Sequence, residues 1–243
     1  MTNRLTRAFA QLGWLNALLY LCDRALAPLS GGRWGIHKYQ FVAQRLGEQP
    51  LCANRGRDID VRLLASRAAI PPGYPRPAEV LDRRYAQGAI SLAAFRRQDL
   101  VGFLWLLFDA YQEDEVRARY RLVSSGSCWD FDVYVRPEDR LGWAFRRLWD
   151  EARCLLRARA VRWSCSRISA FNPASLAAHA RIGTVPLGSA VFLRCGNWQW
   201  MVATLAPHFH CSRHPASYPQ LLLDTSRLDH HANLEPPCRH SSK

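Results

Sequence analysis

The chain has 243 residues, of which 49% are hydrophobic, and its formal net charge is +13. This length and composition can bury an ordinary core, which excludes a wholly disordered protein. The basic residues are scattered along the sequence, which disfavours a nucleic-acid-binding module. The positive charge could instead serve to bind anionic lipid or a polyanionic cofactor. Alternatively, it reflects only a GC-rich genome, in which Arg codons replace Lys codons.

The N-terminal segment, residues 3–28, has an apolar face and ends at a Gly-Gly pair, which predicts a helix. Its uncharged run, 8–22, is too short to span a bilayer comfortably. We expect the helix to pack on the main domain or on a second subunit in a homodimer; the alternative is a peripheral contact with the inner membrane surface. Residues 1–56 are therefore predicted to form an N-terminal helical extension, with 39–44 as a strand or a helix.

The middle of the chain, residues 57–205, alternates between the periods of strands and helices, which predicts one mixed α/β domain. A turn-rich connector precedes a short helix and then two strands around a tight turn. The predicted helices are 78–85, 141–158 and 173–182; the predicted strands are 90–95, 100–111, 129–135, 161–169, 185–194 and 198–205; 116–123 is a strand or a helix.

The C-terminal segment, residues 206–243, is rich in His, Pro and Ser and is predicted to be an irregular tail with one apolar piece, 221–223. Its His and Cys residues match no zinc-module spacing, so no metal is expected. The eight Cys of the chain include no C-x-x-C pair, and no convincing signal peptide precedes them. We therefore expect free thiols in a cytoplasmic protein.

One candidate site is the turn between strand 129–135 and the helix that follows it. The first amides of a helix lack partners and lie at the positive end of its dipole, so they can bind phosphate. Gly142 and Ala144 leave this backbone little covered, and Arg140 adds a charge. The alternative is that Gly142 only allows the helix to pack closely on the sheet.

A second candidate is the short helix from Asn172 to Gly183. Asn172 is a good N-cap, and Gly183 suits the C-terminal cap. Ser175 and His179 are four residues apart and share a face, and a His there can donate or relay a proton near neutral pH. The alternative is a surface His without a role.

Acidic residues mark the strand before the turn. Asp130 and Asp132 alternate with apolar residues, so both are expected on one face of the strand. Buried acids need partners or a function. They could act as a base; the alternative is an ion pair with an Arg of 117–121. The acidic run 113–115 is a second group, and Arg167 and Ser169 are expected to open onto the same cleft, as substrate contacts or as structural residues.

The order strand, Arg-x-Gly-x-Ala turn, long helix, strand, Asn-x-x-Ser-x-x-x-His-x-x-x-Gly resembles the GNAT acyltransferase superfamily over residues 58–205. The resemblance implies a mixed, mostly antiparallel sheet flanked by helices. Two positions depart from the family pattern: Asp139 stands at the first basic position of the turn, and His179 stands where the family often has Tyr.

The resemblance also implies roles for individual residues. The turn would bind the CoA pyrophosphate, the preceding strand would pair with the pantetheine arm, and Asn172 would hydrogen-bond that arm. The implied acid is His179, and the implied base is Asp132 or Asp130. The implied cofactor-binding residues are Phe131, Val133, Tyr134, Val135, Arg140, Leu141, Gly142, Trp143, Ala144, Phe145, Asn172 and Ser175.

The sequence thus predicts an N-acyltransferase that transfers an acyl group directly to an amine. Acetyl-CoA is the expected donor, and the sequence does not reveal the identity of the amine. The alternatives are a catalytically silent CoA-binding regulatory protein of the same fold and a basic protein that associates with the membrane surface.

Overall fold

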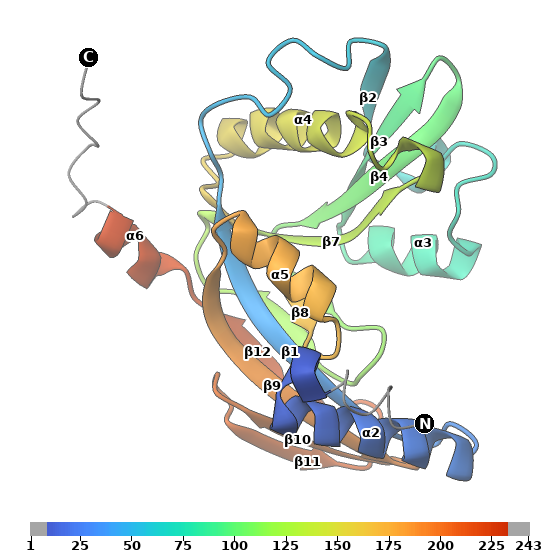
Figure 1. Ribbon diagram of the computed structural model, residues 1–243, viewed down its shortest axis with the longest axis vertical. Helices are drawn as coiled ribbons and strands as arrows, with labels where there is room; N and C mark the ends of the chain where they lie inside the picture. Colours follow the sequence, from blue (N-terminus) through green and yellow to red (C-terminus); the bar gives the residue numbers. More distant parts are fainter. Residues whose placement is uncertain (1–8, 233–243) are drawn as a thin grey trace.

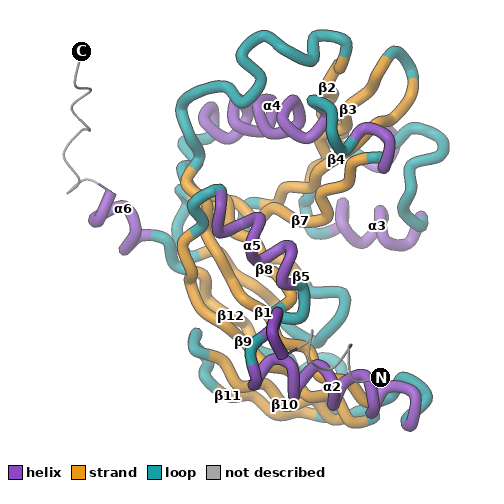
Figure 2. Tube along the Cα trace, in the orientation of Figure 1, coloured by secondary structure: helices purple, strands orange, loops and turns teal. Residues whose placement is uncertain are grey.

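The computed structural model describes residues 9–232 (Figures 1 and 2). Residues 3–8 of the predicted first helix and 233–243 of the predicted tail lie outside this range. The helices are α2 (Trp14–Leu29), α3 (Ala78–Ala86), α4 (Ala144–Ala158), α5 (Pro173–Arg181) and α6 (Ser226–Ala232). The strands are β1 (Trp34–Arg45), β2 (Ile59–Leu64), β3 (Ile90–Arg96), β4 (Asp99–Leu107), β5 (Ala110–Gln112), β6 (Arg119–Leu122), β7 (Ser127–Val135), β8 (Trp163–Ser169), β9 (Val185–Cys195), β10 (Trp198–Ala203), β11 (Phe209–Ser212) and β12 (Gln220–Leu223).

Nine of the strands form one sheet in the order β11-β10-β9-β1-β8-β7-β4-β3-β2. Every neighbouring pair is antiparallel except β7 and β8, which run parallel. The other strands form a small sheet, β12-β6-β5. The predicted fold class, a mixed and mostly antiparallel sheet flanked by helices, is confirmed.

Helix α4 forms because its apolar residues recur every four positions along one side. Ala144, Leu148, Ala152 and Leu156 are fully buried, and the stripe packs against Leu104 and its neighbours in β4. Arg and Asp residues occupy the other sides of the helix. One face of the sheet is therefore closed by α4 over strands β2 to β4, with α5 and α2 farther along (Figure 1).

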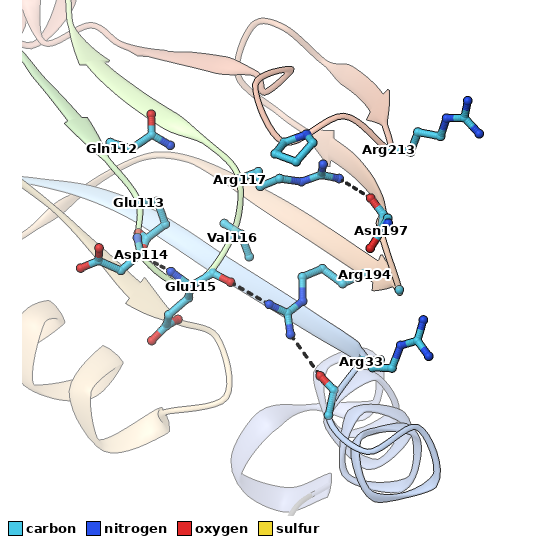
Figure 3. Close-up of a pocket in the computed structure, with 13 residues that line it drawn as sticks. Arg33, Gln112, Glu113, Asp114, Glu115, Val116, Arg117, Arg194, Asn197 and Arg213 are labelled. Atoms are coloured by element: carbon cyan, nitrogen blue, oxygen red, sulfur yellow. Dashed lines mark hydrogen bonds between the residues drawn. The ribbon is translucent and has the colours of Figure 1, made fainter. Parts of the chain in front are cut away.

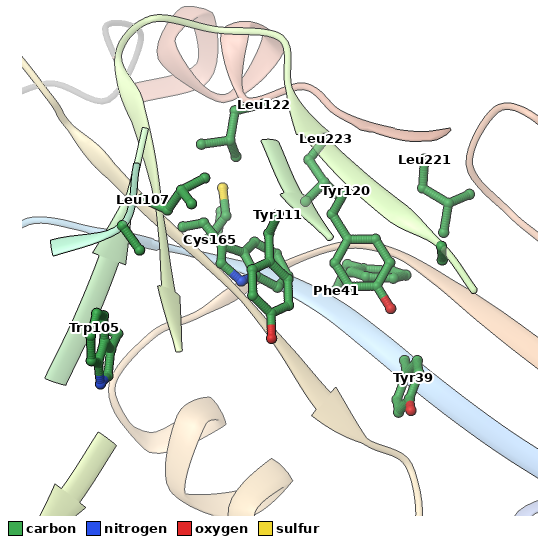
Figure 4. Close-up of a cluster of buried hydrophobic side chains, with 14 of the residues drawn as sticks. Tyr39, Phe41, Trp105, Leu107, Tyr111, Tyr120, Leu122, Cys165, Leu221 and Leu223 are labelled. Carbon is green, nitrogen blue, oxygen red and sulfur yellow. The ribbon is translucent and has the colours of Figure 1, made fainter. Parts of the chain in front are cut away.

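The opposite face of the sheet is packed with aromatic side chains under α3 and the small sheet. Trp129 stacks on Tyr111 and lies at a tilt against Tyr120. Figure 4 shows Tyr111 and Tyr120 with Leu221 and Leu223 of β12, which complete the cluster. Strand β4 is buried on both faces from Val101 to Leu107, because a layer covers each side. Such a strand reads as a continuous apolar run.

Two parts of the chain differ from the prediction. Residues 34–45, expected within a helical extension, form β1 in the interior of the main sheet, between β8 and β9. Their period of two is clear only from Lys38 to Phe41; it breaks where the register against β9 shifts between Phe41 and Val42, and Val42 and Ala43 are then both buried. The expected irregular tail contains β11, β12 and α6. Strand β11 pairs with β10, which directly precedes it, and β12 pairs with β6, far earlier in the chain; these pairings order residues that are weakly patterned alone.

Candidate active site

The main sheet opens between its two parallel strands. Strands β7 and β8 pair only at Ser127–Trp163, Cys128–Ser164 and Trp129–Cys165. Beyond these residues β7 stays with β4, up to Val135, and β8 stays with β1, up to Ser169. The last part of each strand therefore presents an edge to the gap, where its peptide groups have no sheet partner.

A cavity of about 610 Å³, which we call the helix-side cavity, lies on the α4 and α5 face of this gap. Its floor is polar where the strands diverge, at Asp130 and Ser166, and its walls are mostly apolar. A shallower cavity of about 340 Å³ continues toward the start of α4 and shares Val133 and Phe145 with it. The helix-side cavity is lined by Gln44, Leu46, Leu51, Asp130, Val133, Phe145, Arg146, Trp149, Arg153, Ser166, Ala178, His179 and Ile182.

A second cavity of about 350 Å³, the acidic cavity, lies on the opposite face, against α3 and the small sheet. Asp130 lines both cavities, so they approach each other at the point where the sheet opens. The carboxylates of the acidic cavity outnumber its two arginines. It is lined by Arg84, Tyr111, Glu113, Asp114, Glu115, Trp129, Asp130, Phe131, Asp132 and Arg167.

Asp130 combines this position with an unusual protonation equilibrium. Its side chain is buried, and its Oδ2 accepts one hydrogen bond, from Ser164 Oγ at 2.7 Å. Burial raises the pKa of Asp130 from 3.8 to about 6, and the Ser164 hydrogen bond and the nearby charge of His179 offset part of this rise. A carboxylate with such a pKa can accept a proton near neutral pH, as a general base must.

Asp132 does not share a face with Asp130, so that prediction is wrong. Its φ is +48°, and the register of β7 against β4 shifts between Phe103 and Trp105. This bulge adds a residue and turns the side chain of Asp132 to the face that carries α3. Sequence alternation cannot show such a shift, because the pairing with β4 imposes it.

Asp132 is ion-paired there, but not with the arginines expected. Arg76 binds both of its carboxylate oxygens, and Arg84 Nη1 donates to Oδ2 at 2.6 Å. Burial acts to raise the pKa of Asp132, but the hydrogen bonds and charges of Arg76 and Arg84 outweigh it and lower the pKa below its ordinary value. A carboxylate held in this way is a poor proton acceptor.

His179 lines the helix-side cavity from α5. Its Nδ1 lies 2.7 Å from the carbonyl oxygen of Ser175, one turn earlier in the helix, and so carries the proton and donates it. This fixes the tautomer and leaves Nε2 as the nitrogen available for chemistry. Nε2 accepts a proton when the ring is neutral and donates one when the ring is an imidazolium.

The start of α4 carries the free amides that the sequence suggested. No side chain caps the helix, and the N–H groups of Leu141, Trp143, Ala144, Phe145 and Arg146 form no hydrogen bond with any of residues 9–232. Leu141 is fully exposed. Arg140 lines the shallow cavity with Val135 and Phe145. Gly142 avoids a tight contact here, because a Cβ would lie 3.2 Å from the Asp139 carbonyl oxygen.

Asp139, which stands at the first basic position of the resembling motif, is a structural residue of this turn. Its buried carboxylate accepts hydrogen bonds from Arg96 and Arg136, and its carbonyl accepts from the Gly142 N–H. Burial acts to raise the pKa of Asp139, but the two arginines outweigh it and lower the pKa. The carboxylate of Asp139 therefore ties the turn to β3 and forms no hydrogen bond with the first amides of α4.

The remaining predicted residues divide between the cavities and the scaffold. Asn172 caps α5 by accepting the N–H of Ser175 at 3.0 Å, and neither residue lines a cavity. Ser169 accepts the N–H of Phe171 and also lines none. Tyr134 lines the shallow cavity, whereas Trp143 packs beneath Arg55 and Arg146.

Arg167 does face the acidic cavity, held by a carboxylate that is fully buried. Glu113 accepts from Arg167 Nε and Nη2, and its Oε1 also accepts the N–H groups of Asp114 and Glu115. Burial acts to lower the pKa of Arg167, but Glu113 and its neighbours raise it. Arg167 is therefore a permanent cation in the wall of the cavity.

Sequence reasoning missed several wall residues. Arg84 is buried on the apolar side of α3. The one sequence signal for this is its spacing, three residues after the buried Leu81, which places both on the same side of the helix. Ser164 gave no signal, because its contact with Asp130 joins two strands. Arg84 Nε and Trp129 Nε1 are buried donors of the acidic cavity that have no partner among the described residues.

Within residues 9–232, no three His, Cys, Asp or Glu side chains are arranged to hold a metal ion. None of the helices in that range is both long and apolar enough to cross a bilayer.

Comparison with known proteins finds no family model that matches the chain and no match among curated proteins. Solved structures that it resembles include a conserved protein of unknown function from Staphylococcus epidermidis, at 14% identity and a TM-score of 0.44, over 72% of this chain and 68% of that one. Another is a tandem GNAT protein from the clavulanic acid biosynthesis pathway, at 15% identity and a TM-score of 0.42, over 74% of this chain and 57% of that one.

A third is a GCN5-related N-acetyltransferase from Sphaerobacter thermophilus, at 14% identity and a TM-score of 0.39, over 70% of this chain and 55% of that one. The chain thus spans little more than half the length of these last two proteins. At such identities and scores the likeness concerns the fold, and the activity has to be argued from the site itself.

Proposed function

We propose that the chain is an acyl-CoA-dependent N-acyltransferase of the GNAT type, transferring an acyl group directly to an amine. The observation that carries the proposal is the opening between β7 and β8, where Asp130 lines a cavity on each face of the sheet. A donor on one face and an acceptor on the other could meet at this residue. Ordinary sheet packing gives no reason for a buried carboxylate there.

The residues present fit an acyl-CoA on the helix side. The free amides at the start of α4, with Arg140 beside them, suit its diphosphate. The mostly apolar cavity past Val133 and Phe145 suits its pantetheine arm, whose amides would find the unpaired edges of β7 and β8. Bound there, acyl-CoA would supply an activated acyl thioester.

We assign the base to Asp130 rather than to Asp132. Burial raises the pKa of Asp130, which forms no ion pair with a described residue, whereas Asp132 is paired with Arg76 and Arg84. The acceptor ammonium first releases one proton to solvent; as the amine nitrogen then bonds to the acyl carbon and the carbon–sulfur bond breaks, Asp130 takes the second proton from that nitrogen. His179, as imidazolium, gives its Nε2 proton to the departing sulfur. Asp132 instead pairs with Arg76 and positions Arg84 in the wall of the acidic cavity.

Two measurements test the proposal. Acetyl-CoA should raise the melting temperature, whereas a nucleotide that lacks the pantetheine should give a smaller rise. Turnover of acetyl-CoA with primary amines should fall at least a hundredfold in Asp130→Asn. The matched control is Asp60→Asn, at an exposed carboxylate, which should keep full activity. Binding without turnover of any amine would favour a catalytically silent CoA-binding protein.

A second candidate role, at the membrane surface, is favoured by the outer side of α2. Trp14, Leu15, Leu18 and Leu29 are 72%, 48%, 45% and 83% exposed. An apolar stripe of this kind on a strongly basic protein can bind an anionic bilayer surface. Co-sedimentation with phosphatidylglycerol vesicles should be lost in Leu15→Ser/Leu18→Ser and kept in Val202→Ser/Phe209→Ser. Loss of a dimer in sedimentation, without any vesicle binding, would assign the stripe to a second copy instead.

A further inference from the structure

A further cavity, of about 520 Å³, lies beside the acidic cavity and shares Glu113, Asp114 and Glu115 with it. Four loops build it: the turn before β1, the β5–β6 loop, the β9–β10 hairpin and the loop after β11. Each contributes an arginine, directly or from the strand beside it. These are Arg33, Arg117, Arg194 and Arg213, and we call this space the arginine cavity.

None of the four arginines forms an ion pair with a residue in the range 9–232. Arg117 donates to the carbonyls of Asn197 and Ser212, and Arg194 donates to those of Glu115 and Gly32. Carbonyls are neutral and leave the charge uncompensated. Arg33 and Arg213 donate to no described residue, so their guanidinium groups are free to bind.

The carboxylates that border the arginine cavity are engaged elsewhere. Glu113 is bound by Arg167, and Glu115 accepts from Arg167 and the Tyr39 hydroxyl. Asp114 accepts from the Tyr111 hydroxyl at 3.2 Å and lies 3.7 Å from Arg83. The acids therefore do not neutralise the four arginines, although they stand in the same wall.

Charge is consequently separated along the two joined cavities. Figure 3 shows the acids of the β5–β6 loop at one side and Arg33, Arg194 and Arg213 at the other. The acidic side is shared with the cavity that Asp130 lines, where the acceptor nitrogen would react. The cationic side lies farther from Asp130, which is absent from the arginine cavity. A molecule that fills both would be positive at its reacting end and negative at the other.

We propose that the acceptor is an amine that also carries an anionic group, a carboxylate or a phosphate, and that the arginine cavity binds this group. The inference rests on the proposed function. Guanidinium groups bind both kinds of anion through paired, charge-assisted hydrogen bonds. The acidic cavity would attract the ammonium, and the arginines would select amines whose far end is an anion over amines of equal length without one.

The test compares three amines of one chain length as acceptors from acetyl-CoA: 6-aminohexanoate, 6-aminohexanol and 1,6-diaminohexane, with 6-aminohexyl phosphate to distinguish the two anions. We expect kcat/KM to be about tenfold or more higher for an anionic amine than for the neutral one. Arg33→Gln/Arg213→Gln should remove this preference through KM and leave the neutral amine within about twofold. Arg57→Gln/Arg227→Gln, at exposed positions outside the cavities, removes the same charge and should keep the preference.

Equal turnover of all the amines, or an equal effect of the two double variants, would overturn the inference while leaving the acyltransferase intact. If no amine is turned over, the proposed function fails instead, and calorimetric titration with 6-aminohexyl phosphate still tests the site. Binding by the wild type that Arg33→Gln/Arg213→Gln abolishes would support an anion site, and no binding would refute it.

Discussion

The substitution Asp130→Asn should make the protein more stable at neutral pH while it removes the activity. Asp130 has a folded-state pKa of about 6, against 3.8 ordinarily, because burial disfavours its ionised form. Between these two values the folded protein binds a proton that the unfolded chain has released. The contribution of Asp130 to the stability of the wild type therefore falls as pH rises from about 4 to about 6 and then stays level.

The size of this effect follows from the shift in the pKa of Asp130. Each unit corresponds to about 1.4 kcal/mol, so a rise from 3.8 to about 6 lowers the free energy of unfolding by about 3 kcal/mol at neutral pH. An asparagine at this position has nearly the same shape and does not ionise. Its amide oxygen can still accept the hydrogen bond that Ser164 Oγ donates to the carboxylate at 2.7 Å.

Urea unfolding of both proteins at several pH values measures the difference. We expect nearly equal stabilities at pH 4 and an advantage of the variant that grows to about 3 kcal/mol by pH 7. The pH dependence of the activity provides a second measurement. Because only ionised Asp130 can take a proton, wild-type kcat/KM should decline as pH falls through about 6. A variant that is less stable than the wild type at pH 7, or a gap that does not vary with pH, would refute the reasoning.

Three other substitutions test the remaining parts of the site. Asp132→Asn should destabilise the protein by about 3–5 kcal/mol in urea unfolding, because it leaves the buried Arg84 without its partner. Because the pKa of Asp132 is lowered, its ion pairs stabilise the folded protein at neutral pH, and this stabilisation is lost in acid. Equal free energies of unfolding for the wild type and Asp132→Asn at pH 7 would contradict this reasoning. Leu141→Glu should weaken acetyl-CoA binding about tenfold in a calorimetric titration by placing a negative charge beside the free amides of α4, whereas Leu141→Gln should not. His179→Gln should lower kcat about a hundredfold, and an unchanged kcat would exclude His179 as the acid.

The parts of the site that were predictable are those encoded by neighbouring residues. Helix α4 could be predicted because Gly142, Ala144 and its apolar spacing all lie within a few turns, although it begins at Ala144 and not at residue 141. The cap of α5 by Asn172 is equally local. The orientation of Asp132 could not be predicted, because its bulge arises from pairing with β4, and its partner Arg84 comes from α3, 48 residues earlier.

The gap that defines the site is itself the result of such a distant pairing. Strand β8 pairs with β7 at three positions but with β1 at seven, so its course is set mainly by β1. Strand β7 is held on its other side by β4. Each strand thus follows a different neighbour after Trp129, and the sheet opens between them. The N-terminal strand, far from every motif of the site, is therefore what keeps β8 away from β7 and leaves Asp130 between two cavities.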